Sequence, residues 1–173
     1  SNHFSFRKGS TSQNYPNSLM GSVALLKQSI YDSRWYKQNN KINNEVNLSL
    51  DAINKNIDLP NIIEVRDKLR ILLAQKVGKE LNINFIIKGI GDEYQRLNEI
   101  KTGFTNLIVP VNFPKAFNVD DPFKNNNLSL GQLKHWEMAP SNLYFLEKNG
   151  IKIIQIDEPA ATTHPDEINL VVD

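Results

Sequence analysis

Short apolar runs alternate with amphipathic stretches along most of the chain. The four clearest runs cover residues 62–66, 83–88, 106–110 and 151–156. Each run is apolar at consecutive positions, as in strands that are buried on both faces, and helical patterns separate one run from the next. Intervals of about 20 residues between runs suit βα units with short loops. The pattern therefore predicts a parallel sheet whose strands are joined by right-handed helical crossovers, with residues 168–172 as a further strand candidate.

Helical patterns fill the segments between these runs and most of the N-terminal part of the chain. Leu19, Val23, Leu26 and Ile30 recur at spacings of three and four, which predicts a helix over residues 18–38. We expect the Asn-rich tracts at 39–44 and 124–127 to be surface loops, since Asn competes for backbone hydrogen bonds. The segment from His3 to Asn14 is polar and is assigned no element. Further helices are predicted at residues 49–54, 68–81 and 93–101, and in two pieces within 129–149, broken before Pro140.

These elements predict an α/β protein that forms a single domain over residues 1–173. A complete (β/α)8 barrel needs about 250 residues, so the chain has room for four or five βα units. The fold is therefore either part of such a barrel or a compact open parallel sheet. Ser1-Asn2 is typical of a tag remnant, and we expect the chain to be a fragment of a longer protein.

Composition narrows the classes of function. Twenty basic and nineteen acidic residues give a net charge of +1 without a basic stripe, so nucleic acid is not expected as a partner. The absence of cysteine excludes disulfides, thiolate metal sites and thiol nucleophiles. No apolar run reaches the roughly 18 residues of a membrane span, and no signal-peptide pattern opens the sequence.

Polar residues at the ends of the predicted strands are the strongest site candidates. Glu64, Lys88 and Asp157 each stand at or just past the carboxyl end of a different strand. The carboxyl ends of parallel strands meet at one edge of a sheet, where ligands bind in α/β proteins. We expect the three side chains to converge there, either around a pocket or simply pairing with each other and with helix amides.

Two other motifs point to structure rather than chemistry. Gly89-Ile90-Gly91 follows a strand, but Glu93-Tyr94 stand where a dinucleotide fingerprint would need its third glycine, so a plain turn is favoured. His135 and His164 lie beside carboxylates, yet neither has a second His one helical turn away, as a zinc site often requires. We therefore expect His135 to pack or to form hydrogen bonds.

Several stretches of the chain resemble the amidohydrolase superfamily, and in particular large secreted imidazolonepropionase-like members from Bacteroidetes-type bacteria. The resemblance covers roughly residues 3–155 and consists of short similar segments rather than of a catalytic motif. They are Phe4-Ser5-Phe6-Arg7-Lys8-Gly9, residues 15–28, Leu59-Pro60, Asp67-Lys68-Leu69, Ile86-Ile87-Lys88-Gly89, residues 92–96, Pro110-Val111-Asn112-Phe113-Pro114 and residues 134–142.

The resemblance implies a metal-dependent (β/α)8 barrel that hydrolyses a C–N bond with a metal-activated water. The family's metal ligands are a His-x-His after the first strand, an acid or carboxylated Lys on the fourth, a His on each of the fifth and sixth, and an Asp on the eighth. If residues 62–67 match the fifth strand and 86–89 the sixth, Glu64 and Lys88 replace two metal histidines. Asp157 would then match the Asp of the eighth strand.

These departures imply a degenerate metal site, because the chain has no His-x-His and a Lys in a ligand position repels a cation. We expect no cofactor in this segment, while zinc or another divalent metal would belong to the parent family. The partner implied is the remainder of the parent chain, or a second copy of this chain in a homo-oligomer. The location implied by the resemblance is the periplasm or the outside of the cell. Two hypotheses follow: an amidohydrolase-like segment that is not catalytic alone, or a noncatalytic structural or interaction module on an α/β scaffold.

Overall fold

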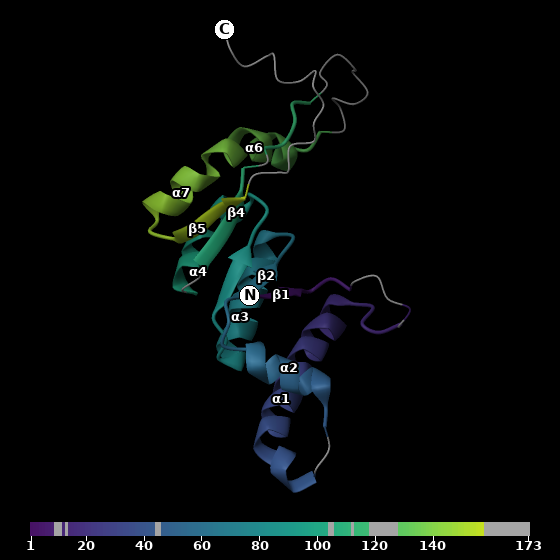
Figure 1. Ribbon diagram of the computed structural model, residues 1–173. Helices are drawn as coiled ribbons and strands as arrows, with labels where there is room; N and C mark the ends of the chain where they lie inside the picture. The colour runs from purple at the N-terminus through teal and green to yellow at the C-terminus, as the bar shows by residue number, and fades with distance from the viewer. Residues whose placement is uncertain are drawn as a thin grey trace, which may run out of the picture.

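The computed structural model describes residues 1–8, 12, 14–43, 46–103, 106–111, 113–117 and 128–157, without the side chains of 40–43, 155 and 157. Its centre is a five-stranded sheet in the order β1-β2-β3-β4-β5, with every neighbouring pair parallel (Figure 1). The strands are β1 (Asn2–Ser5), β2 (Asn61–Glu64), β3 (Phe85–Lys88), β4 (Asn106–Pro110) and β5 (Lys152–Asp157). This confirms the predicted α/β class, and the strand order is that of consecutive βα units in part of a barrel.

The helices lie between the strands in the chain. They are α1 (Leu19–Asn43), α2 (Leu48–Asn56), α3 (Lys68–Leu81), α4 (Leu97–Thr102), α6 (Leu130–Met138) and α7 (Asn142–Lys148), with 3-10 turns η1 (Glu93–Arg96) and η2 (Ala139–Ser141). Local signals explain several boundaries. Asp67 caps α3 by accepting a hydrogen bond from Arg70 N, and Ser129 and Gln132 form a reciprocal capping box at the start of α6.

One face of the sheet carries the hydrophobic core. Along β2 and β3, alternate residues point to this face, and Ile63 and Ile87 are fully buried there. The helices cover it with apolar side chains from α1, α3, α4 and α7, and Phe6 packs into the same cluster beyond the end of β1. The sheet and the helices on this face therefore form one continuous core.

The opposite face, which we call the open face, is only partly covered. It carries the other alternate residues of the strands, of which His3, Ser5 and Glu64 are exposed and Ile62, Ile86 and Lys88 are partly exposed. Parallel sheets are usually covered on both faces, so this exposure is unusual for the architecture. In a closed (β/α)8 barrel the corresponding face points into the barrel interior.

The structure differs from the sequence-based expectations in two places. Strand β1 lies in the segment that was assigned no element, because its four residues acquire a strand conformation only by pairing with β2, which begins 59 positions later. Helix α1 continues to Asn43 instead of ending at Gln38, so the expectation of a loop at 39–44 is wrong for residues 39–43. Asn39 Nδ2 donates to Trp35 O at 2.9 Å, within the helix, instead of competing with it. The expected strand at 168–172 and loop at 124–127 lie outside the described residues.

No helix in the described part of the chain is both long enough and apolar enough to cross a membrane.

Candidate functional site

Glu64 and Lys88 lie next to each other at the carboxyl end of the sheet. They are register partners on β2 and β3, on the open face, and Lys88 is in turn opposite Ile108 on β4. The backbone of Asp157 ends β5 opposite Pro110, at the same edge, but its side chain lies outside the described residues. The sheet thus places all three residues at one rim, and their convergence into a cluster stays a prediction.

A hollow of about 370 Å³ opens beside Glu64 and Lys88. We call it the rim hollow; its lining is formed by His3, Phe4, Ser5, Ile62, Glu64, Lys88 and Ile108. The sequence pattern does not indicate the β1 residues of this lining, because it does not predict β1. The signal was the alternation of exposed His3 and Ser5 with the more buried Phe4 and Phe6, which is the period of a strand.

The rim hollow does not have the donor set of a divalent metal site. Among the described residues, no three His, Asp or Glu side chains come together in a way that could hold a metal ion. His3 and Glu64 do line the hollow, but Lys88 contributes an ammonium group beside them, which repels a cation. We therefore derive no chemistry through a metal at this position.

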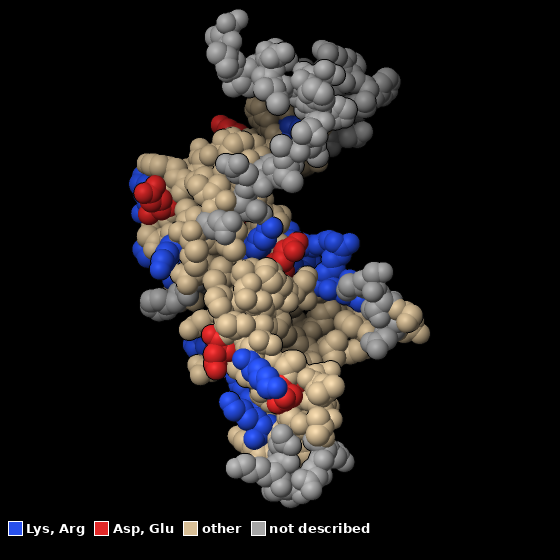
Figure 2. Space-filling model, in the orientation of Figure 1, with Lys and Arg blue, Asp and Glu red and all other residues tan. Residues whose placement is uncertain are grey.

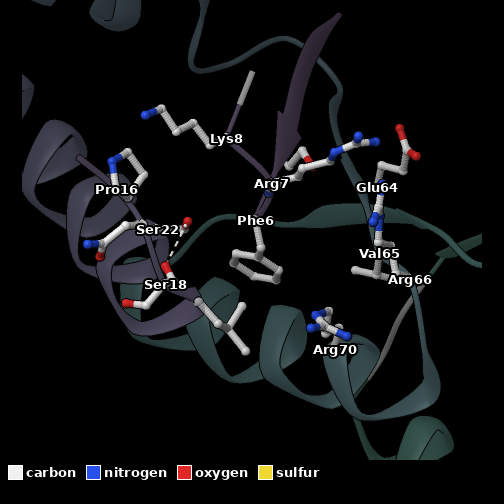
Figure 3. Close-up of a pocket in the computed structure, with 13 residues that line it drawn as sticks. Phe6, Arg7, Lys8, Pro16, Ser18, Ser22, Glu64, Val65, Arg66 and Arg70 are labelled. Atoms are coloured by element: carbon white, nitrogen blue, oxygen red, sulfur yellow. Dashed lines mark hydrogen bonds between the residues drawn. The ribbon is translucent and has the colours of Figure 1, made fainter. Parts of the chain in front are cut away.

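A second pocket, of about 350 Å³, lies at the ends of β1 and β2 near the start of α1 (Figure 3). We call it the basic pocket. Its lining consists of Ser5, Phe6, Arg7, Lys8, residues 16–19, Ser22, Glu64, Val65, Arg66 and Arg70. In the close-up, Arg7 extends from the end of β1, Arg66 follows β2, and Arg70 projects from α3. Glu64 lines both this pocket and the rim hollow, so the two are neighbours.

Positive charge dominates the basic pocket. Arg70 forms an ion pair with Asp67, the N-cap residue of α3. Neither Arg7 nor Arg66 forms an ion pair within the part of the chain that the structure describes. Figure 2 shows the corresponding gathering of basic side chains beside the end of β1, with acidic atoms next to it.

The loop after β3 binds a carboxylate of its own. Glu93 is completely buried, and its Oε1 accepts hydrogen bonds from the N–H groups of Ile90 and Gly91 at 2.9 and 3.1 Å. Its Oε2 accepts a third bond from Asn142 Nδ2 at 2.6 Å. Gly89 is required here, because a Cβ at that position would lie 1.9 Å from Glu93 Oε1. The glycine loop is therefore a structural turn, as predicted, whose amides are already occupied.

Polar groups next to this loop connect it to α3 and α6. Asp92 Oδ2 accepts a hydrogen bond from Lys68 N at 3.1 Å, while Oδ1 is buried without a partner among the described residues. Burial raises the pKa of the Asp92 carboxyl above its ordinary value, against the lowering effect of Lys68. His135 Nδ1 lies 3.1 Å from Tyr94 Oη and the two rings stack, so His135 is used in packing and hydrogen bonding, as expected.

Comparison with known proteins gives a match at the level of structure. No family model matches the chain, and no curated protein matches it by sequence. The crystal structure of an amidohydrolase from Thermotoga maritima MSB8 superposes with a TM-score of 0.57 and 16% sequence identity. The match covers 82% of this chain but only 36% of the amidohydrolase, so the chain spans about a third of that protein's length. At this identity the similarity concerns the fold alone.

Proposed function

We propose that the chain is a segment of an amidohydrolase-like protein that contributes part of the barrel and of its carboxyl-end rim but is not catalytic alone. The observation that carries this proposal is the sheet itself: five parallel strands in chain order, with Glu64 and Lys88 side by side at the rim. The structural match to an amidohydrolase supports the same assignment. The activity that the resemblance implies for the complete protein is hydrolysis of a C–N bond, for which a metal held elsewhere in that protein would supply an activated water.

The rim residues define what this segment can contribute. By the family resemblance, Glu64 and Lys88 stand at positions of metal histidines, and the ammonium group of Lys88 opposes a cation there. We assign to Glu64, Lys88 and Asp157 the role of polar groups that face a substrate, with Lys88 balancing the carboxylates. The metal and the remaining βα units would come from a longer form of the chain, and export to the periplasm or the medium belongs to the same proposal.

The second candidate is a noncatalytic interaction module. The partly covered open face favours it, because a parallel sheet with partly exposed Ile62 and Ile86 has apolar area available for a partner. The two candidates differ in what must cover this face: further βα units of the same protein, including a second copy, or an unrelated partner.

The test compares the 173-residue chain with a longer form that carries the remaining βα units. Both are incubated with zinc, dialysed, analysed for bound metal by mass spectrometry, and assayed against N-acyl amino acids and cyclic amides. We expect no stoichiometric metal and no hydrolysis for the short chain, and both for the long form. In the long form, Lys88→Gln and Glu64→Gln should lower kcat/KM by about tenfold or more, through lost charged contacts. The exposed Glu137→Gln is the control.

Three outcomes would change the assignment. Stoichiometric zinc and hydrolysis by the short chain would show that it is a complete enzyme. An inactive long form would favour the interaction module. If both rim substitutions leave the activity of the long form unchanged, Glu64 and Lys88 do not contact the substrate.

A further inference from the structure

We propose that the basic pocket binds the phosphate group of a small phosphate monoester. This inference concerns a different site from the rim hollow and does not depend on the amidohydrolase-like function. It rests on the shape of the pocket, the charges around it and the state of those charges in the folded chain.

The charge of the basic pocket matches that of a doubly charged anion. Four of its lining residues are basic (Arg7, Lys8, Arg66 and Arg70) and one, Glu64, is acidic. Asp67 pairs with Arg70 and neutralises one further positive charge. Arg7 and Arg66 carry two positive charges that no acidic residue of the described chain pairs with, and a phosphate monoester dianion balances two charges near neutral pH.

Two of the guanidinium groups are available for a ligand. Arg7 and Arg66 are exposed and have no ion-pair partner among the described residues. Guanidinium groups bind phosphate oxygens through paired N–H donors, and these two arginines follow different strands, β1 and β2. A ligand bound by both arginines needs oxygens for each of them; a tetrahedral phosphate monoester offers three charged oxygens, whereas a carboxylate offers two in one plane.

The start of α1 adds donors on a third side. The lining includes Ser18, Leu19 and Ser22, and Ser18 Oγ accepts from Gly21 N at 3.1 Å. The N–H groups of the first helical residues have no partner within a helix, and the first turn of α1 has no acidic residue. A helix N-terminus favours phosphate in such a position, although here it only supplements the arginines.

The remaining lining is apolar and sets the kind of molecule that carries the phosphate. Phe6 and Val65 are buried at the base of the pocket, and Leu19 borders it. A volume of about 350 Å³ is near the lower end for small-molecule sites, which run from roughly 300 Å³. The pocket therefore suits a small phosphate monoester with a compact, partly apolar body, rather than a nucleotide or a polymer.

The contrast with the loop after β3 strengthens the inference. There the backbone donors are saturated by the buried carboxylate of Glu93. In the basic pocket, Glu64 is the acidic residue of the lining, and it forms no ion pair with Arg7 or Arg66. Within the described part of the chain, Arg7 and Arg66 therefore have no acidic side chain paired with them at this site.

The experiment is a titration of the ¹⁵N-labelled 173-residue chain with phenyl phosphate, followed by NMR at constant ionic strength because exposed charges are screened by salt. We expect saturable binding that shifts the amide signals of Leu19 and Met20 and the Nε–H signal of Arg7. Arg7→Gln and Arg66→Gln should each raise Kd by about five- to tenfold, as expected for loss of one charged hydrogen-bonding group. Arg96→Gln, which removes the same charge from an arginine outside the pocket, should change Kd by less than about twofold.

Phthalate and benzoate distinguish phosphate from carboxylate recognition. Weaker binding of phthalate and no measurable binding of benzoate support the proposal. Phthalate binding as tightly as phenyl phosphate would overturn the phosphate assignment. Absence of saturation, shifts confined to other regions, or equal affinities in the wild type and both pocket variants would overturn the site itself. Circular dichroism of each variant confirms that these exposed substitutions leave the fold intact.

Discussion

Two neighbouring regions at the carboxyl ends of the strands differ in whether their hydrogen-bond donors already bind a carboxylate of the chain. After β3, the glycine loop holds the buried carboxylate of Glu93 with three hydrogen bonds. After β1 and β2, arginines line a pocket in which Arg7 and Arg66 form no ion pair within the described part of the chain. The first arrangement is closed and contributes to stability, whereas the second is open and is available to a ligand. The comparison shows that a glycine-rich loop after a strand need not be the anion site.

Removing the buried carboxylate of Glu93 should have the largest effect on stability. Glu93→Ala leaves two backbone N–H groups and the Asn142 amide without their acceptor, in a fully buried position. Because each buried donor left unpaired costs about 1–3 kcal/mol, we expect the free energy of unfolding to fall by about 3–5 kcal/mol in urea titrations. The exposed Glu137→Ala should change it by less than about 0.5 kcal/mol. A small effect of Glu93→Ala would show that the loop does not depend on this carboxylate.

Crowding the same carboxylate should have a smaller effect. In Gly89→Ala the new Cβ would lie 1.9 Å from Glu93 Oε1, so the carboxylate or the loop must move. We expect a loss of about 1–3 kcal/mol in the same measurement, as for overpacking elsewhere. The matched control is Gly131→Ala in α6, where the nearest atom is 3.8 Å away. That control should leave stability unchanged or raise it by up to about 1 kcal/mol, since Ala favours a helix.

A third prediction concerns the pH dependence contributed by Asp92. Its pKa is raised in the folded chain by burial, so the folded state binds its proton more tightly than the unfolded state does. The wild type therefore loses stability as pH rises from the ordinary carboxyl range through the raised pKa, and Asp92→Asn should not show this loss. Unfolding free energies of both proteins between about pH 3 and pH 8 test the sign. The exposed Asp58→Asn controls for removal of one negative charge. The prediction is contradicted if the unfolding free energy of the wild type rises relative to that of Asp92→Asn as the pH increases.

The smallest effect on stability should come from introducing a carboxylate into the basic pocket by substitution. Ser22→Asp adds a carboxylate near the start of α1, where it faces the arginines and the positive end of the helix. We expect a gain of about 0.3–1 kcal/mol in unfolding free energy, together with weaker binding of phenyl phosphate. Ser49→Asp, in the first turn of α2 and outside the pocket, should leave phosphate binding unchanged. Undiminished phosphate binding by the Ser22 variant would place the ligand elsewhere.

Much of the architecture could be predicted because its signals are local. The apolar runs around Ile63, Ile87 and Val109 are β strands, and the helix starts at Asp67 and Ser129 use side chains within three residues of the amides they cap. Parallel pairing was also predicted, since a helix between two strands supplies the crossover connection that parallel neighbours require. The rim position of Glu64 and Lys88 is a direct consequence of that pairing.

The remaining features depend on residues that are distant in the sequence. Strand β1 is short and polar at alternate positions, and it is stabilised by β2 and by burial of Phe6 in a core built mainly from later elements. The basic pocket likewise combines cations that follow β1, follow β2 and lie on α3. The sequence by itself determined the helices, most of the strands and their direction, because hydrophobic period and capping act over a few residues. Only the tertiary structure decided which charges are neutralised internally and which face a pocket, because that depends on the register and packing of elements up to about sixty residues apart.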